Sequence, residues 1–252
     1  MVVGPEGRGD GHEEGAIILA AVPRPVLALL VTLGAAAALA ACGGDDEPAR
    51  TQAPTTTATT TERAALPEGC ERADEPRPRS DPRERRPRGR LASGRTWTVQ
   101  LRTNCGTIAI RLATDRTPRT AASFAALVRR GFYDGLAFHR IAAGFVIQGG
   151  DPLGTGIGGP GYSVVERPPS GLRYTRGTVA MAKTEDEPAG ASGSQFFIVT
   201  APDARLPPEY ALVGNVSGGV DAVARIASAR TTPDERPVAP MVIERATLDS
   251  SG

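Results

Sequence analysis

The sequence predicts a mostly β fold, in which eight antiparallel strands form a closed barrel capped by two α-helices. About eight short stretches after residue 95 alternate or concentrate apolar residues, as strands do. Two longer stretches have the apolar spacing of amphipathic helices. The elements do not follow the strand–helix–strand rhythm of a parallel sheet, which favours one antiparallel barrel over residues 95–252.

The expected strands begin with a hairpin. Residues 97–103 and 107–112 alternate apolar and polar side chains, and Asn104, Cys105 and Gly106 between them suit a turn. Further strands are expected at 136–141, 145–148, 177–182, 194–200, 211–216 and 241–248. The last of these can close the sheet against the first. The glycine-rich residues 149–162 are expected to form a long surface loop, since they lack the ending of a phosphate-binding loop.

Two helices complete the expected domain. Thr117 can cap the first helix and Pro118 suits its first turn, while Phe124 marks its apolar face. Gly131 is expected to end that helix. Residues 219–228 have the spacing of the second helix.

The composition excludes several classes of function. A net charge of +1 argues against a dedicated nucleic-acid surface, so no nucleic-acid partner is expected. Cysteine and histidine residues are not spaced as a zinc site requires, and we expect neither a metal nor a cofactor. His139 is the only histidine after residue 95, so a Ser-His-Asp or Cys-His arrangement is unsupported.

The N-terminal residues 1–41 are expected to be a signal peptide. Residues 26–41 form an apolar run shorter than the roughly 20 residues of a membrane span. Residues 39–42, Leu-Ala-Ala-Cys, resemble a bacterial lipobox. This resemblance implies a lipoprotein that is acylated at Cys42 and anchored to the cell membrane on its extracytoplasmic side. The alternatives are an ordinary signal peptide and an anchor helix.

Residues 42–94 are rich in Thr, Pro and Arg and are expected to be a disordered linker. Residues 75–90 could instead form a basic patch for anionic lipid or wall polymer, although a solvated linker is the simpler interpretation. Cys70 and Cys105 form an even pair on an exported chain, which favours a disulfide. The alternative is that both thiols remain free.

The stretch 138–151, Phe-His-Arg-Ile-Ala-Ala-Gly-Phe-Val-Ile-Gln-Gly-Gly-Asp, places Arg140 within an apolar run. An arginine is almost never fully buried without a partner. Arg140 must therefore reach solvent, pair with an acid, or face a cleft in which a ligand supplies the acceptor.

Together with 191–200 and 210–214, this stretch resembles the cyclophilins, and the resemblance covers residues 96–249. It implies an eight-stranded barrel with two helices and peptidyl-prolyl cis-trans isomerase activity on proline-containing polypeptides. Arg140 would be the catalytic residue, and we expect the protein to be a monomer. The other site residues that the resemblance implies are Phe145, Val146, Phe197 and Leu206 in the proline pocket, Gln148, Gln195 and the backbone near Ala182 and Lys183 along the substrate chain, and Tyr210 at the rim.

Two departures from the family pattern bear on specificity. Arg205 stands where many members have a tryptophan that donates to cyclosporin, so weak cyclosporin binding is expected. Residues 183–188 lengthen a loop and add charge beside the groove. Met181 suits either the pocket floor or the core, whereas His139 is expected to be a strand residue that plays no part in catalysis.

Three functions remain open. The first is an isomerase that assists folding of exported proteins outside the cytoplasmic membrane. The second is a non-catalytic module at the cell surface that binds proline-containing segments as a chaperone. The third is a wall-polymer adhesin that acts through the arginine-rich linker. The cation at Arg140 favours the first, since a pure binding module has no need of it.

Overall fold

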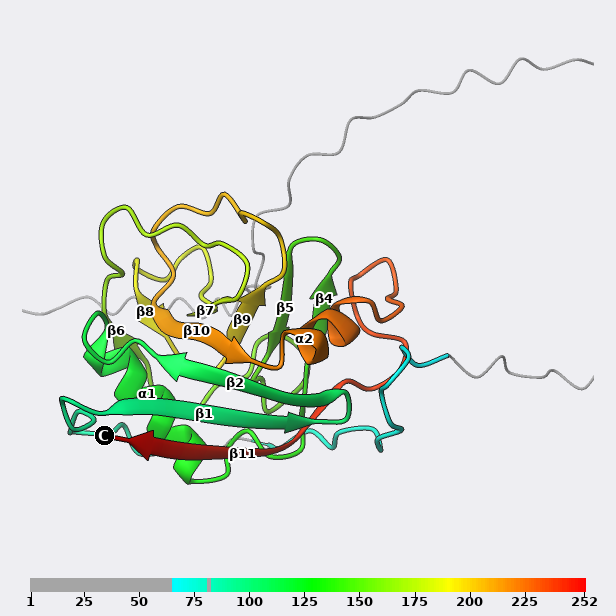
Figure 1. The fold of residues 1–252 in the computed structure, drawn as a ribbon, viewed down its shortest axis with the longest axis horizontal. Coiled ribbons are helices and arrows are strands. Elements are labelled where there is room, and N and C mark those ends of the chain that lie inside the picture. Colours follow the sequence, from blue (N-terminus) through cyan, green and yellow to red (C-terminus); the bar gives the residue numbers. More distant parts are fainter. Residues whose placement is uncertain (1–64, 81–82) are drawn as a thin grey trace, which may run out of the picture. The chain divides into compact units, whose positions relative to one another are not determined.

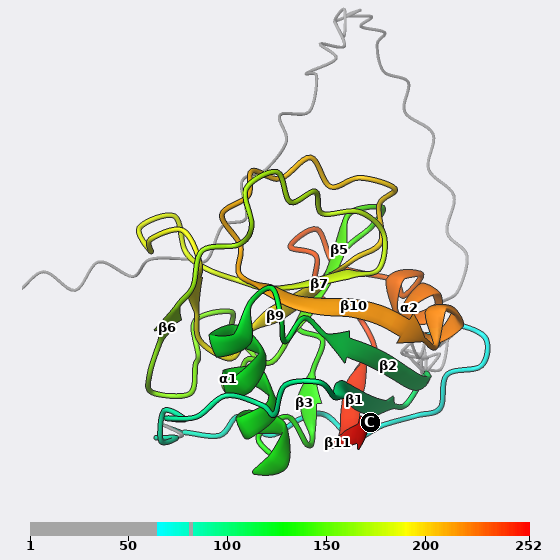
Figure 2. The same cartoon turned by 60° about the vertical axis from the view of Figure 1, so that its left-hand side comes forward.

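An antiparallel sheet of nine strands organises the fold (Figures 1 and 2). The computed structural model describes residues 65–80 and 83–252, so the expected signal region 1–41, the expected acylation site Cys42 and linker residues 43–64 lie outside the described residues. The strands are β1 Thr96–Thr103, β2 Gly106–Leu112, β3 Leu136–Ala137, β4 Arg140–Ala142, β5 Val146–Gly149, β6 Val164–Val165, β7 Thr178–Met181, β8 Ala191–Ser192, β9 Phe196–Val199, β10 Leu212–Gly218 and β11 Val242–Ser251. The helices are α1 Pro118–Arg129 and α2 Val220–Ala227.

The order of strands across the sheet is β3-β11-β1-β2-β10-β7-β9-β5-β4. β11 pairs with β1 along its length, which confirms that the last strand joins the first. The two end strands, β3 and β4, are separated in the chain only by Phe138 and His139, and no ladder joins them in the described part of the chain. The mostly β, antiparallel fold with two helices is confirmed, whereas closure into a full barrel is not shown.

The strand count differs from the expected eight for two reasons. Each expected strand is present, but the stretch 136–141 is interrupted at Phe138 and His139 and forms both β3 and β4. β6 and β8 add a separate two-stranded ribbon. A strand of two residues is too short to show an alternation of apolar and polar residues in the sequence.

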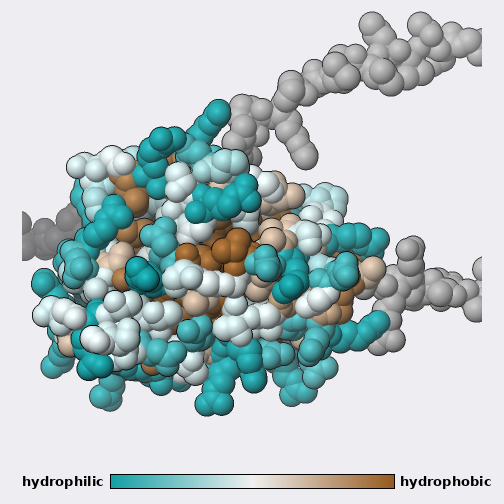
Figure 3. Space-filling view, viewed as in Figure 1, coloured by the Kyte–Doolittle hydropathy of each residue, from teal (hydrophilic) through white to brown (hydrophobic). Residues whose placement is uncertain are grey.

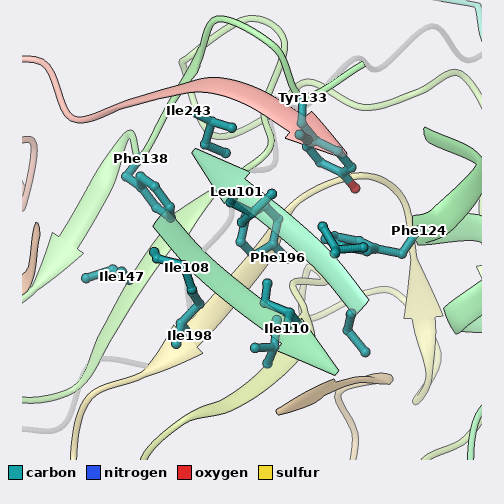
Figure 4. Close-up of a cluster of buried hydrophobic side chains, with 14 of the residues drawn as sticks. Leu101, Ile108, Ile110, Phe124, Tyr133, Phe138, Ile147, Phe196, Ile198 and Ile243 are labelled. Atoms are coloured by element: carbon teal, nitrogen blue, oxygen red, sulfur yellow. The ribbon is translucent and has the colours of Figure 1, made fainter. Parts of the chain in front are cut away.

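The main hydrophobic core lies between α1 and the inner face of the sheet. Figure 4 shows side chains from distant parts of the sequence meeting there, among them Leu101, Ile110, Phe124 and Phe196. Phe124 packs edge-on against Phe196, with ring centroids 5.5 Å apart. The predicted apolar face of α1 is therefore confirmed. Figure 3 shows one face of the molecule, with hydrophilic side chains around its edge and a hydrophobic patch near its centre.

The two ends of α1 differ in how well the sequence predicts them. Gly131 follows the helix with a φ of +68°, and its N–H donates to the Val128 carbonyl while the next N–H reaches back to Leu127. This is a Schellman ending, as the glycine predicts. Thr117, however, does not cap the helix, because its hydroxyl donates to the Leu212 carbonyl. The carboxylate of Glu166 caps it instead, accepting from two N–H groups of the first turn at 3.2 and 2.7 Å.

Residues 65–80 and 83–94, here called the N-terminal strap, are ordered against the domain. The expectation of a disordered linker does not hold for them. The strap N–H groups of Glu71, Arg79 and Glu84 donate to backbone carbonyls of the domain at 2.6 to 2.8 Å. A disulfide joins Cys70 to Cys105 with an S–S distance of 2.05 Å, which is the pair suggested by the cysteine count. The sequence of the N-terminal strap contains no apolar run, but the folded domain supplies the strap with hydrogen-bond partners and an apolar surface.

None of the helices in residues 65–80 and 83–252 is long and apolar enough to cross a membrane.

Candidate active site

A second apolar cluster lies on the face of the sheet that turns away from the main core. Side chains alternate along each strand, so Ile147 and Ile198 enter the main core while Val146, Phe197 and Val199 enter this second cluster. Strand pairing then sets these side chains beside one another across β5 and β9. The cluster is therefore a direct product of the strand register.

The cluster contains six of the residues that the family resemblance implies. They are Phe145, Val146, Ala182, Phe197, Leu206 and Tyr210. Val146, Phe197 and Tyr210 are buried, whereas Phe145 and Leu206 are only half-buried and form its accessible edge. Met181, for which the sequence left two possibilities, belongs to the main core.

Three aromatic rings form one wall of the cluster. Phe197 and Tyr210 pack edge to face with centroids 5.5 Å apart, and Tyr174 lies 5.9 Å from Tyr210. The Tyr174 hydroxyl donates to the Tyr210 carbonyl at 2.6 Å and accepts from its N–H at 3.0 Å. Burial raises the pKa of Tyr210 above its ordinary value, with smaller contributions from Glu209 and Glu185. Sequence reasoning missed Tyr174, which stands alone in a loop without a periodic pattern.

Arg140 lies at the end of a row of side chains that crosses three strands. Arg140 pairs with Gln148 in the β4–β5 register, and Gln148 pairs with Phe197 in the β5–β9 register. Two bonds hold the guanidinium: Nε lies 2.7 Å from Oε2 of Glu235, and Nη1 donates to Oε1 of Gln148 at 3.3 Å. A guanidinium has five N–H donors, so three remain for other partners.

The bond to Glu235 bears on the three possibilities that the sequence left for Arg140. The guanidinium pairs with an acid within the protein, which was one of those possibilities. Glu235 lies 95 residues further along the chain, in the loop before β11, and its carbonyl accepts from the N–H of Ile141. No local pattern connects the two residues, which is why sequence reasoning did not find Glu235.

Gln195 is hydrogen-bonded to other residues of the protein. Its expected contact with the substrate chain stays a prediction. Its amide oxygen accepts from Gln148 at 3.0 Å. Its amide nitrogen donates to the carbonyls of Gly156 and Gly158 at 2.8 and 2.9 Å. Both N–H donors of the amide therefore have partners in the glycine-rich loop, and Gln195 fixes Gln148, which in turn fixes Arg140.

The backbone at Ala182 and the side chain of Lys183 are also engaged within the protein. The Ala182 N–H donates to the Gln195 carbonyl at 2.9 Å. The Lys183 ammonium donates to the carbonyl of Thr184 at 3.0 Å, and it lies 3.6 Å from Glu209 and 5.7 Å from the centroid of the Tyr210 ring. The expected substrate contacts at these two positions remain predictions.

Arg205 precedes Leu206 in the chain, at the position where the sequence departs from the family pattern. Its side chain is exposed, and its N–H donates to Asp203 at 2.9 Å. Its φ is +54°. Arg205 therefore presents a charge beside Leu206 instead of an indole N–H.

His139 is buried beside this polar row, and neither ring nitrogen has a hydrogen-bond partner among the described residues. Burial lowers the pKa of His139 to about 4, and the opposing effect of Asp151 only partly offsets it. The imidazole is therefore neutral at pH 7. Asp151 accepts from the N–H groups of Leu153 and Gly156, which organises the glycine-rich loop.

The geometry combines an apolar cluster with an adjacent fixed cation. Phe145 and Leu206 form the half-buried edge of the cluster, and three guanidinium N–H groups of Arg140 stand beside the row that leads to Phe197. Such a site can hold a small apolar ring and donate hydrogen bonds to the polar atoms next to it.

Comparisons with known proteins identify the family of this chain. Residues 98–248 match the family model for cyclophilin type peptidyl-prolyl cis-trans isomerases. A peptidyl-prolyl cis-trans isomerase-like 1 of Rhizopus delemar is 42% identical over 142 residues, 55% of this chain and 84% of the relative. Peptidyl-prolyl cis-trans isomerase B of Streptomyces anulatus is 37% identical over 169 residues, which cover 60% of this chain and 95% of the relative.

Solved structures agree with the sequence comparisons. A cyclophilin type peptidyl-prolyl cis-trans isomerase of Cryptosporidium parvum, crystallised in the presence of the dipeptide Ala-Pro, is similar with a TM-score of 0.57 and 30% identity. The likeness covers 61% of this chain and 99% of that one. The present chain therefore belongs to the cyclophilin-type peptidyl-prolyl cis-trans isomerases, and its enzymatic class is that of this family.

Proposed function

We propose that the site beside Arg140 isomerises X-Pro bonds of exported polypeptides, and that Arg140 is the catalytic residue. One observation carries the assignment: two bonds fix the guanidinium while three of its N–H donors remain for a substrate. In this proposal the proline ring occupies a recess edged by Phe145 and Leu206. Phe197 forms its floor.

The mechanism follows from the chemistry of the amide bond. Resonance makes the X-Pro bond stiff, with a rotational barrier of about 18–20 kcal/mol. When the bond twists, the prolyl nitrogen loses conjugation and becomes a better hydrogen-bond acceptor. A donor that meets this nitrogen, or the neighbouring carbonyl, stabilises the twisted form more than either planar form. No covalent intermediate is required.

The supporting residues keep this donor in place. Glu235 binds Nε, and Gln148 binds Nη1 from the other side. A preorganised donor does not have to be reoriented when the substrate twists, which is the condition for electrostatic stabilisation to accelerate a reaction. The neutral His139 next to it adds no competing positive charge at pH 7.

The assay is protease-coupled isomerisation of a short X-Pro peptide with wild type, Arg140→Ala and Arg245→Ala. Arg245 is an exposed arginine on β11 and serves as the control. We expect catalysis by the wild type and the control, and a loss of about 100-fold in kcat/KM in Arg140→Ala, since one electrostatic donor is removed. A wild type that binds the peptide without accelerating its isomerisation would favour the non-catalytic binding module.

We also assign this activity to the extracytoplasmic side of the membrane, with Cys42 as the site of lipid attachment. The lipobox-like residues 39–42 support this, as does the disulfide between Cys70 and Cys105, because disulfides persist in oxidising compartments. The test is expression of wild type and Cys42→Ser in a bacterial host that processes lipoproteins. We expect membrane retention and an acyl mass increment for wild type only; equal retention without acylation would contradict the assignment.

A further inference from the structure

An arginine-lined hollow lies between the N-terminal strap and helix α1, built from elements other than those that form the proline recess. Its volume is about 1060 Å³. None of the residues that line it is acidic. Six are arginines, namely Arg85, Arg86, Arg88, Arg90, Arg119 and Arg130. The isomerase site uses none of these residues.

The strap backbone holds the arginines around the hollow. The Glu84 N–H donates to the Pro160 carbonyl at 2.8 Å, and Arg130, the residue that follows α1, donates to the Arg85 carbonyl at 2.7 Å. At the other end of the arginine run, the partly buried side chain of Leu91 packs against the main core. The run is therefore attached to the domain on both sides, and its arginines line the same hollow as Arg119 and Arg130.

Acidic side chains compensate only part of this charge. Arg130 lies 3.1 Å from Glu84, and Arg119 lies 3.5 Å from Glu166, whose carboxylate also caps α1. The side chains of the remaining four arginines of the hollow are exposed and make no ion pair with any acid of the described residues. Cations held this closely repel one another, and a ligand with several negative charges would relieve the repulsion.

We propose that this hollow binds a chain of linked phosphate groups. A planar guanidinium donates two parallel hydrogen bonds to phosphate oxygens, and phosphate recognition is a common use of clustered arginine. Several guanidinium groups around one concave surface suit several phosphates in one molecule better than one. The proposal is independent of isomerase activity.

The lining separates this ligand from two other kinds of polyanion. Proteins that bind single-stranded nucleic acid stack its bases on aromatic side chains, and none lines the hollow. Attachment to a membrane surface uses exposed apolar side chains that enter the bilayer, and Pro87 and Val164 are the only large apolar side chains in the lining. A concave surface also fits a projecting chain better than a flat bilayer.

The experiment measures binding of tripolyphosphate to the full chain by isothermal titration calorimetry. The test variant is Arg85→Ala/Arg88→Ala, and the control is Arg111→Ala/Arg245→Ala, which removes the same charge from exposed positions on β2 and β11. We expect saturable binding by wild type. The Kd should rise about tenfold or more in the test variant, because charge-assisted hydrogen bonds are lost, and within about twofold in the control.

Three further readouts complete the test. Added NaCl should weaken tripolyphosphate binding through screening, and orthophosphate should bind at least about tenfold more weakly. Isomerase activity should be the same in the test variant as in wild type, and this measurement serves as the control that the variant is folded. Equal weakening in both double variants would overturn the proposal. Tighter binding to phosphatidylglycerol vesicles or to a single-stranded oligonucleotide than to tripolyphosphate would also overturn it and assign the surface to a membrane or to nucleic acid.

Discussion

Replacement of Glu235 tests whether Arg140 must be held in place to catalyse. Nε of Arg140 lies 2.7 Å from Glu235, and the two side chains are 21% and 43% exposed. An ion pair this accessible contributes about 0–1 kcal/mol to folding, so Glu235→Ala should lower Tm by less than about 4 °C. The loss should instead appear in the reaction rate.

The expected loss follows from the bonds that remain. Without Glu235 only the bond to Gln148, at 3.3 Å, restrains the guanidinium. The donor is misplaced but still present, so the cost should be smaller than that of deleting a donor outright. We expect kcat/KM to fall about 3- to 10-fold in Glu235→Ala, equivalent to about 0.7–1.4 kcal/mol of transition-state stabilisation.

The assay and its controls separate positioning from charge. Glu235→Gln keeps an acceptor for Nε and should stay within about threefold of wild type if geometry is what Glu235 provides. Glu244→Ala removes an acid on β11 that pairs with Arg102 on β1 and should leave kcat/KM unchanged. An unaltered or faster Glu235→Ala enzyme would refute the reasoning, since it would show that Glu235 does not position Arg140.

Three further predictions concern stability. His139 has a folded-state pKa of about 4, below its ordinary value of 6.5, so the unfolded state binds more protons between these values and stability falls as pH drops. Urea unfolding should show that the free energy of unfolding of wild type falls between pH 7 and pH 4.5, and that His139→Gln reduces this fall by on the order of 2–3 kcal/mol. The same pH dependence of stability in both proteins would contradict the prediction. Glu166→Ala should lower Tm by about 3–6 °C because it removes the cap of α1, measured by circular dichroism, and an unchanged Tm would exclude a capping role. Removing the disulfide with Cys70→Ser/Cys105→Ser should cost about 3–4 kcal/mol in urea unfolding, because the bond closes a loop across a sequence separation of 35; a loss below about 1 kcal/mol would indicate that the strap binds without it.

The sequence predicted what depends on local periodicity. The strands of the main sheet and both helices follow from alternation and apolar spacing, and Gly131 marked the end of α1 because only a residue that tolerates positive φ suits that position. The members of the cluster around Phe197 came from the family resemblance, and the strand register explains why Val146 and Phe197 lie on the face opposite Ile147.

Features that depend on distant partners were missed. Glu235 binds Arg140 from 95 residues away in the sequence. Glu166 caps α1 by binding the N–H of Thr120, 46 residues away. Neither glutamate belongs to a local pattern. The strap has the composition of a disordered segment, yet the domain supplies partners for its N–H groups and Cys105 anchors it covalently. Composition describes what a segment can bury by itself and says nothing of a surface provided by the rest of the chain.

The most direct test of the central claim compares binding with catalysis in Arg140→Ala. The twisted form, not the ground state, is proposed to require the guanidinium, so kcat/KM for an X-Pro peptide should fall about 100-fold while the Kd of the same peptide, measured by NMR titration, changes by less than about threefold. Equal changes in kcat/KM and in Kd, or no change in either, would contradict the role of Arg140 in the transition state.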